Sequence, residues 1–467
     1  MTTHCPDSSQ SAFFRQQGAA LLMMLMLLII GALYLFIEPL SAARMQADRD
    51  KRTARALAQA KQALIAYAAS YGDKHLNKVH GYLPCPETAI PASLADEGSA
   101  EGSCGPKNIS VIGRLPWKTL GLEPLRDGSG ECLWYAVSGT YKNNPGTDML
   151  NWDTPGLFTI LSSNGVGNAS SPEDRAAAVI FSPGAVSGSQ NRIPVANAGV
   201  CSGNYSASNY LEASAAASNA VVSTIAGAVS NFIAGGIDNG VNDTLLAVTP
   251  QEVFGAIEKR SDFTALVSSF TEHVGNCLAV YGSQNAAGAS DKRLPWPAPV
   301  ALADYLANAS YSDGSGGLSG RLPYRVSNSK VKTANGLIGS TLLAGCPGPW
   351  SALDDEWYKN WKDHLFYALA AAFHPGATAP SFCPDCLSAN NAGAYAAIVL
   401  FAGKKLSGQS RTTPADKALI VNYLEGRNSA NGANAGGNSD YQTGPVTAGF
   451  NDILYCVDNA LNVLPCP

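Results

Sequence analysis

The stretch Arg15-Gln16-Gln17-Gly18 is followed by residues 19–37, a charge-free run rich in Leu, Met and Ile. Nineteen residues at a helical rise of about 1.5 Å each approach the roughly 30 Å hydrocarbon thickness of a bilayer. We therefore expect a membrane-spanning helix over residues 19–37 and treat the rest of the chain as carried by this anchor. No other apolar run of the sequence approaches this length.

The composition limits the classes of function. A chain of 467 residues favours two or three domains. A net charge of −5, without a basic stripe, argues against a nucleic-acid partner. The sequence contains no phosphate-binding Gly-x-x-x-x-Gly-Lys-Ser/Thr, no Gly-x-Ser-x-Gly nucleophile elbow and no His-Glu-x-x-His zinc pair. We therefore expect no enzyme, no catalytic residues, no cofactor and no metal site.

Cysteine usage indicates an oxidising compartment. Of eleven cysteines, Cys5 precedes the apolar run and ten follow it, which is more than reducing compartments favour. Cys277 falls on the apolar face of an expected helix. The other nine are our candidates for disulfides, with connectivity left open: Cys85, Cys104, Cys132, Cys201, Cys346, Cys383, Cys386, Cys456 and Cys466.

Three interpretations of the N-terminus compete. Ser41-Ala42-Ala43 offers a cleavage site for a secretory signal, but the apolar run is long for one. A plain signal anchor fits the length, although more basic residues follow the run than precede it. Thirdly, the short polar leader ending at Gly18 before an apolar helix resembles the N-termini of type IV pilins and type II secretion pseudopilins.

This resemblance implies that a prepilin peptidase cuts between Gly18 and Ala19 on the cytoplasmic side and that the new N-terminus is methylated. It also implies that the N-terminal helix contacts other pilin or pseudopilin subunits. Most family members have Glu at the fifth mature position, where this chain has Met23. Minor members at filament tips also lack that Glu.

The helix is expected to continue past residue 37. Pro39 should kink it. Further on, apolar residues recur at three- and four-residue steps, the period of one helix face: Leu57, Ala60, Leu64, Tyr67, Ala68 and Tyr71. An apolar half followed by an amphipathic half resembles the long helix of pilins. An ordinary anchor followed by a stalk helix is the alternative.

Short motifs occur twice in the same order. The segment 81–86, with Leu-Pro-Cys-Pro, is echoed by Leu-Pro-Trp-Pro at 294–297, and Gly-Arg-Leu-Pro-Trp at 113–117 by Gly-Arg-Leu-Pro-Tyr at 320–324. Four further pairs follow the same order: 134–137 and 366–369, 178–192 and 397–411, 209–212 and 422–425, 242–246 and 451–455. Such order predicts a tandem duplication. The first set also resembles that of large pilin-like proteins of Gram-negative bacteria.

The duplication requires a second helix before residue 294. Thr249-Pro250-Gln251-Glu252 is a capping box that would start it. We expect strands at 133–137, 177–181 and 244–248, with counterparts later. The predicted fold is α+β, a membrane-spanning long helix followed by two tandem pilin-like domains, each a helix on a small antiparallel sheet with long loops. The expected divisions are a leader at 1–18, a transmembrane helix at 19–37, and domains at 38–248 and 249–467.

Cys383-Pro384-Asp385-Cys386 leaves three interpretations open. A disulfide is favoured. A zinc site would need Cys346, His364 and His374 to complete it, and a redox pair would need a helix after the first cysteine.

Other segments have plainer interpretations. Residues 127–131 are expected to form a turn rather than a calcium loop. His75 and His80 are expected in solvent, the aromatic cluster at 350–366 in a core, and residues 428–444 in a mobile loop.

The sequence therefore favours a structural minor pilin or pseudopilin-like subunit of a type IV pilus or type II secretion-like filament, at the tip or during initiation. Its expected location is the bacterial inner membrane, as a single-pass protein with its C-terminal domains in the periplasm or on an extracellular filament. The alternative is a membrane-anchored periplasmic enzyme or an adhesive, glycan-binding protein.

Overall fold

The structure is a computed structural model. It describes residues 1–2, 16–90, 93–162, 167, 171–196, 199–215, 217–235, 240–283, 292–314, 316–326, 341–343, 346, 350–378, 383, 385–433 and 439–467, without the side chains of 16–20 and 32–42. Most of the expected leader, including Cys5 and Arg15, lies outside the described residues. Gly18 and Ala19 lie in the first turns of helix α1, and their side chains are not described.

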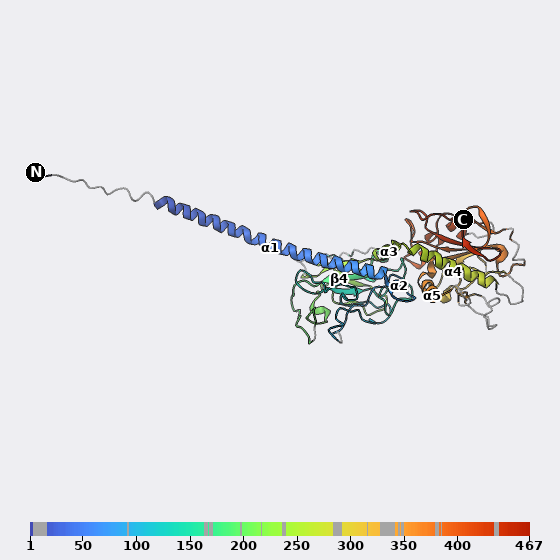
Figure 1. Cartoon of the computed structure of the whole chain (residues 1–467), viewed down its shortest axis with the longest axis horizontal. Coiled ribbons are helices and arrows are strands. Elements are labelled where there is room, and N and C mark those ends of the chain that lie inside the picture. The colour runs from blue at the N-terminus through green and yellow to red at the C-terminus, as the bar shows by residue number, and fades with distance from the viewer. Residues whose placement is uncertain are drawn as a thin grey trace.

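A single long helix dominates the N-terminal part. Helix α1 (Gln16–Ala69) has 54 residues and continues through Pro39, and α2 (Tyr71–Lys74) follows it. Figure 1 shows α1 projecting far beyond the body, which its C-terminal part joins. The face predicted from the apolar spacing is the one that packs, because Leu57, Ala60 and Leu64 are buried.

The expected membrane-spanning helix over residues 19–37 is wrong. Among the described residues, no helix combines the length and the apolar character that a bilayer crossing requires. The apolar side chains described there run over residues 21–30.

The first sheet lies under the C-terminal part of α1. Its four strands are antiparallel and ordered β1 (Val111–Arg114), β2 (Trp134–Val137), β4 (Ala178–Ser182) and β6 (Thr244–Val248). They match the three strands expected from the sequence and add β1. Beside this sheet, β3 (Phe158–Leu161) and β5 (Ser230–Ile233) form a parallel pair.

The second sheet repeats this order and extends it. Strands β7 (Ser319–Arg321), β8 (Leu365–Leu369), β10 (Ala392–Phe401) and β12 (Ile453–Asp458) pair antiparallel in sequence, and β13 (Val463–Pro465) adds to β12. Strand β9 (Leu387–Ala389) pairs with β10, and β11 (Asp440–Tyr441) pairs with β9 in parallel. The fold is α+β, and the first sheet is antiparallel as expected. The second sheet is mixed rather than purely antiparallel, because β11 joins β9 in parallel.

The second helical region is broken. The capping box forms as predicted, with the Thr249 hydroxyl accepting from the Glu252 N–H at 3.3 Å. It starts α3 (Pro250–Glu258), and α4 (Phe263–Ser283) follows as a separate helix rather than a continuation. Part of the loop expected at 428–444 is instead helix α7 (Gly426–Ala433) and strand β11, while 434–438 lie outside the described residues.

The other helices among the described residues are short. They are α5 (Ala352–Trp361) and α6 (Pro414–Lys417), and the single 3₁₀ turns η1 (Pro172–Asp174), η2 (Ala207–Asn209), η4 (Asn308–Ser310), η5 (Lys362–His364), η6 (Ala371–Phe373) and η7 (Ile420–Asn422).

The matched motifs make the same hydrogen bonds in both halves of the body, residues 38–248 (first half) and 249–467 (second half). The Leu83 N–H donates to the Tyr141 carbonyl at 2.8 Å, and the Leu294 N–H donates to the Phe373 carbonyl at 2.8 Å. Likewise, the hydroxyls of two strand tyrosines donate to the proline carbonyls of the Leu-Pro motifs at 3.2 Å, in the pairs Tyr135 to Pro84 and Tyr367 to Pro295. The sequence repeat is thus a repeat of structure.

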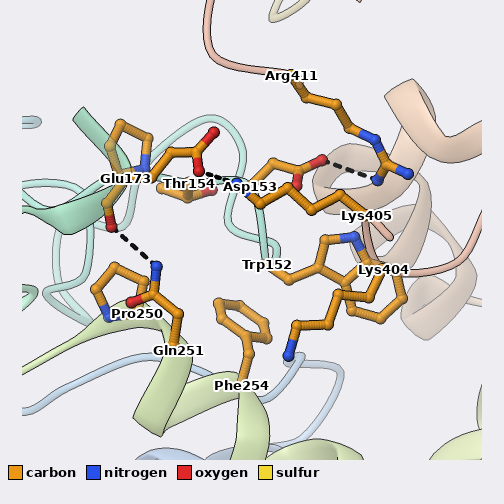
Figure 2. A pocket seen from close by; sticks show the side chains of 11 residues that line it. Trp152, Asp153, Thr154, Glu173, Pro250, Gln251, Phe254, Lys404, Lys405 and Arg411 are labelled. Atoms are coloured by element: carbon orange, nitrogen blue, oxygen red, sulfur yellow. Dashed lines mark hydrogen bonds and ion pairs between the residues drawn. The ribbon is translucent and has the colours of Figure 1, made fainter. Parts of the chain in front are cut away.

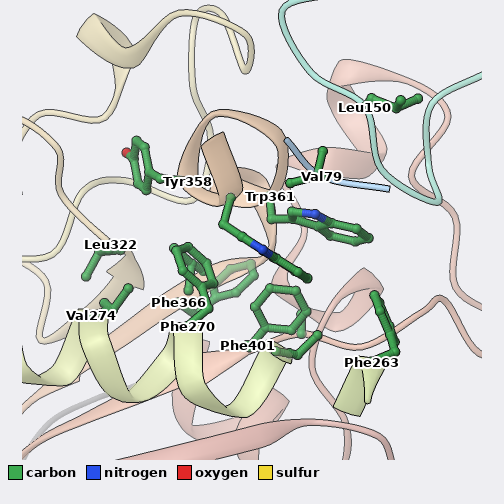
Figure 3. Close-up of a cluster of buried hydrophobic side chains, with 14 of the residues drawn as sticks. Val79, Leu150, Phe263, Phe270, Val274, Leu322, Tyr358, Trp361, Phe366 and Phe401 are labelled. Carbon is green, nitrogen blue, oxygen red and sulfur yellow. The ribbon is translucent and has the colours of Figure 1, made fainter. Parts of the chain in front are cut away.

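One core joins the two halves. Figure 3 shows Val79 and Leu150 of the first half beside Trp361, Phe263 and other apolar side chains of the second half. The aromatic cluster at 350–366 lies in this core, as predicted, and its members Trp357, Tyr358, Trp361 and Phe366 are buried.

Equivalent glycines in β1 and β7 give the first test of the repeat. An added Cβ at Gly113 would overlap the backbone carbonyl of Glu87, and one at Gly320 would overlap that of Ala298. We expect either Gly→Ala change to lower the free energy of unfolding by about 1–3 kcal/mol, because neither backbone can move away freely. Urea unfolding followed by circular dichroism measures this.

The control is Gly102, where nothing lies within 4 Å. Gly102→Ala should change the stability by less than about 0.5 kcal/mol. If Gly113→Ala or Gly320→Ala behaved like this control, the close packing of the two glycines would be wrong.

Candidate functional site

Residues 21–30 of α1, here called the projecting segment, are apolar on every side. All ten side chains are exposed, by between 50% for Ile29 and 72% for Leu21. Met23, in the first turn of this segment, is 68% exposed. A helix that is apolar all round is normally buried by neighbours, so this segment has the character of a contact surface.

Five disulfides hold the body, as the cysteine usage predicted. The pairs are Cys85–Cys104, Cys132–Cys201, Cys277–Cys346, Cys383–Cys386 and Cys456–Cys466. All nine candidates are paired, and the tenth partner is Cys277, which our candidate list omitted. Its place on a helix face did not exclude a bond, because residue 346 approaches α4 from a connecting segment.

A buried cluster of charged side chains lies where the two halves meet. Asp153, beside Trp152, comes from the first half, and the other charged members come from the second. The His364 Nε2 lies 3.1 Å from the Asp153 Oδ2, and the Arg411 Nη1 lies 3.2 Å from the same oxygen. On the other side of His364, the Nδ1 lies 3.1 Å from the carbonyl oxygen of Ala402.

Asp363 extends this charged cluster. The Asn151 amide donates to the Asp363 Oδ1 at 3.0 Å, and the Lys417 Nζ lies 3.5 Å from its Oδ2. Asp363 and His364 are fully buried. The cluster therefore binds a loop of the first half to η5 and neighbouring loops of the second half.

The electrostatics of Asp153 follow from its partners. Burial would raise the pKa of this carboxyl, but Arg411 and the His364 ring outweigh burial and hold the pKa well below its usual range. Asp153 is thus ionised at neutral pH and forms a buried ion pair with Arg411.

The oxygen and nitrogen atoms of Asp153, Asp363 and His364 come within 4.8 Å of one another, a spacing that a metal ion can bridge. Arg411 and Lys417 are next to these carboxylates. Two cations beside two carboxylates neutralise them and would repel a further divalent cation. The donor set fits an ion-pair network better than a metal centre.

The alternative zinc set does not assemble. Cys346 is bonded to Cys277, and Cys383 is bonded to Cys386. His364 lies in the charged cluster, while the His374 ring stacks on Trp296 with centroids 4.9 Å apart.

The cavity beside the charged cluster is small. Figure 2 shows Trp152, Phe254 and the side chains of Lys404 and Arg411 around it. Its volume is about 40 Å³, room for a few water molecules. Lys405, at its rim, pairs with Glu173. This cavity has no space for an organic substrate.

Two further expectations concern single residues. The segment 127–131 is a turn, as expected: the Asp127 Oδ1 accepts from the Ser129 N–H at 2.8 Å, and its Oδ2 accepts from the Gly184 N–H at 2.9 Å. His80 was expected in solvent and is instead buried, because it packs beside Gly72, whose N–H faces its Nδ1 at 3.3 Å. Burial lowers the pKa of His80.

Comparison with protein-family models, with curated proteins and with solved structures finds no match. Sequence reasoning missed Asp153 and considered His364 only as a zinc ligand. It found Arg411 only as part of the repeat, where it matches Arg192. A Trp-Asp pair in a loop has no periodic signal that would mark it for burial.

Proposed function

We propose that this chain is a structural subunit of a filament of the type IV pilus or type II secretion kind, with a role at the tip or in initiation. The observation that carries the proposal is the long helix α1, whose C-terminal part packs on a sheet while its projecting segment is apolar on all sides. Its partners in this proposal are the N-terminal helices of other pilin or pseudopilin subunits.

The projecting segment supports such a contact energetically. Burying apolar surface contributes about 25 cal/mol per Å², and ten exposed Leu, Met and Ile side chains in succession present a large apolar area. The body adds a second argument: the first half lies along the C-terminal part of α1 and the second half lies beyond its end (Figure 1), which is bulky for a repeating shaft. Such bulk suits a subunit present in few copies.

The disulfides support a location of the body in an oxidising compartment. Five bonds distributed over both halves are typical of oxidising compartments. We propose that the body lies in the periplasm or on an extracellular filament and that a prepilin peptidase processes the chain between Gly18 and Ala19.

N-terminal sequencing of the full protein, isolated from cells with and without a prepilin peptidase, tests this proposal. We expect a methylated N-terminus at Ala19 with the peptidase and the unprocessed chain without it. Gly18→Val should block processing, whereas Gly31→Val, a glycine with no neighbour within 4 Å, should not. An N-terminus at Ala43, or at Met1 in both cells, would overturn the proposal and favour a periplasmic enzyme or an adhesive protein.

A further inference from the structure

A pair of carboxyl groups closes the long connection between β4 and β6. The Asp243 Oδ2 accepts from the Glu212 N–H at 2.9 Å and from the Asn219 side-chain amide at 2.9 Å. In return, the Glu212 Oε2 accepts from the Asn242 N–H at 3.1 Å, and its Oε1 accepts from the Gln190 side-chain amide at 2.8 Å. Residues 190, 212, 219 and 243 are thereby tied together at the start of β6.

The connection between β10 and β12 carries the same arrangement. The Asp452 Oδ2 accepts from the Glu425 N–H at 3.1 Å and from the Asn428 side-chain amide at 2.9 Å. The Glu425 Oε2 accepts from the Asn451 N–H at 3.1 Å, and its Oε1 accepts from the Gln409 side-chain amide at 3.0 Å. Four matched hydrogen bonds therefore recur in the two halves.

One carboxyl oxygen of each aspartate accepts no hydrogen bond. The Asp243 Oδ1 and the Asp452 Oδ1 are buried and have no hydrogen-bond partner, and the two residues are 1% and 4% exposed. A buried, ionised oxygen beside a second carboxyl group is unfavourable without a donor. A proton on it removes that cost and supplies a donor to the neighbouring glutamate.

We propose that Asp243 with Glu212, and Asp452 with Glu425, each hold one proton between them, and that loss of this proton opens the connection that the pair closes. These two pairs are called the carboxyl clasps below. When the aspartate proton passes to water, two negative charges face each other in the closed connection, and their repulsion favours the open form. The clasps make both halves sensitive to pH whether or not the chain is a filament subunit.

The electrostatic surroundings agree with this. Burial and the neighbouring Glu212 raise the pKa of Asp243 to about 8, and burial and Glu425 raise that of Asp452 well above its usual value. No described cation pairs directly with either aspartate. Two arginines reach the clasps through glutamines: Arg192 and Arg411 donate to the Gln190 and Gln409 oxygens at 2.6 and 3.4 Å. Arg192 also pairs with Glu131, and Arg411 pairs with Asp153.

The sign of the pH effect follows from these shifts. An exposed Asp titrates at about pH 4, and the pKa of the clasp aspartate is higher in the closed form. Between these two pKa values the closed form binds a proton that the open form releases. The closed form therefore becomes less stable as the pH rises. For each clasp, the equilibrium constant for opening increases by up to tenfold per pH unit. Below about pH 4 the effect vanishes.

Hydrogen exchange of the oxidised full chain, corrected for the intrinsic pH dependence of exchange, tests the proposal. Peptides over 209–215 and 422–428 report on the two clasps. We expect their protection to fall severalfold per unit from pH 5 to pH 8 in the unchanged protein. Asp243→Asn, which replaces the proton by an amide donor, should flatten the response at 209–215 and leave it at 422–428. Asp452→Asn should do the reverse.

Each half is thus the control for the other, and Glu123→Gln, at an exposed position, controls for the loss of a charge. If an aspartate variant fails to fold, Glu212→Gln and Glu425→Gln test the same clasps. A protection that does not change with pH in the unchanged protein would overturn the proposal. So would a response that persists in both Asp→Asn variants.

Discussion

Asp153→Ala is expected to lower the free energy of unfolding by about 3–5 kcal/mol. The change leaves Arg411, which is 2% exposed, as a buried charge without its carboxylate partner at 3.2 Å. Removing one member of a buried ion pair costs this much because the other member stays desolvated. Urea unfolding at pH 7, followed by circular dichroism, measures the loss.

Asp148→Ala is the matched control. Asp148 pairs with Lys107 at the surface, where both side chains are nearly half exposed, so its loss should cost less than about 1 kcal/mol. The double change Asp153→Leu with Arg411→Met should recover part of the stability, since it leaves no buried charge. Equal effects of Asp153→Ala and Asp148→Ala would show that the cluster does not hold the halves together.

Lowering the pH should cause the same loss of stability in the unchanged protein, because it protonates Asp153. The pKa of Asp153 is lowered in the folded state, so its contribution is complete above about pH 4, the value of an unfolded Asp, and is lost as the pH falls further. The clasps have the opposite sign, because their aspartates bind protons in the folded state. Stability should therefore be greatest in mildly acidic solution and fall on both sides.

The sequence predicted the features that periodicity or repetition encodes. The apolar face of α1 at Leu57 to Leu64, the capping box at Thr249 and the strands around 134–137 and 244–248 all depend on local pattern. The order of repeated motifs predicted the equivalence of Gly113 and Gly320 before any contact was known. These signals are local or internal to the chain.

Features that depend on long-range approach were missed. The expectation of a membrane-spanning helix at 19–37 was wrong, because among the described residues no helix is long and apolar enough to cross a membrane. The break between α3 and α4 falls at residues 259–262, Lys-Arg-Ser-Asp, which interrupt the apolar spacing. This break therefore had a local signal, which the prediction of one helix from the repeat did not use. The charged cluster joins residues 153 and 411, and no short-range pattern predicts that two such distant side chains are buried together.

The pairing of the cysteines also depends on long-range approach and could not be predicted from the sequence. Two of the disulfides are expected to contribute strongly to the stability. Cys132–Cys201 and Cys277–Cys346 each close a loop with a sequence separation of 69, one in each half. In the chain-entropy model a loop of this length contributes about 4 kcal/mol, because the bond restricts the unfolded chain. We expect paired Cys→Ala changes of either bond to lower the free energy of unfolding by nearly the same amount.

Cys383–Cys386 is the control, because its separation is 3 and the same model gives about 2 kcal/mol. All three double variants are unfolded in urea without reductant, at one pH, so that only the chosen bond differs. If the loss follows loop length, the two long-loop variants will agree with each other and exceed the short-loop variant. If all three lose the same stability, or if the variants of the two halves differ widely, packing around the buried Cys277 and Cys132 rather than chain entropy sets the contribution.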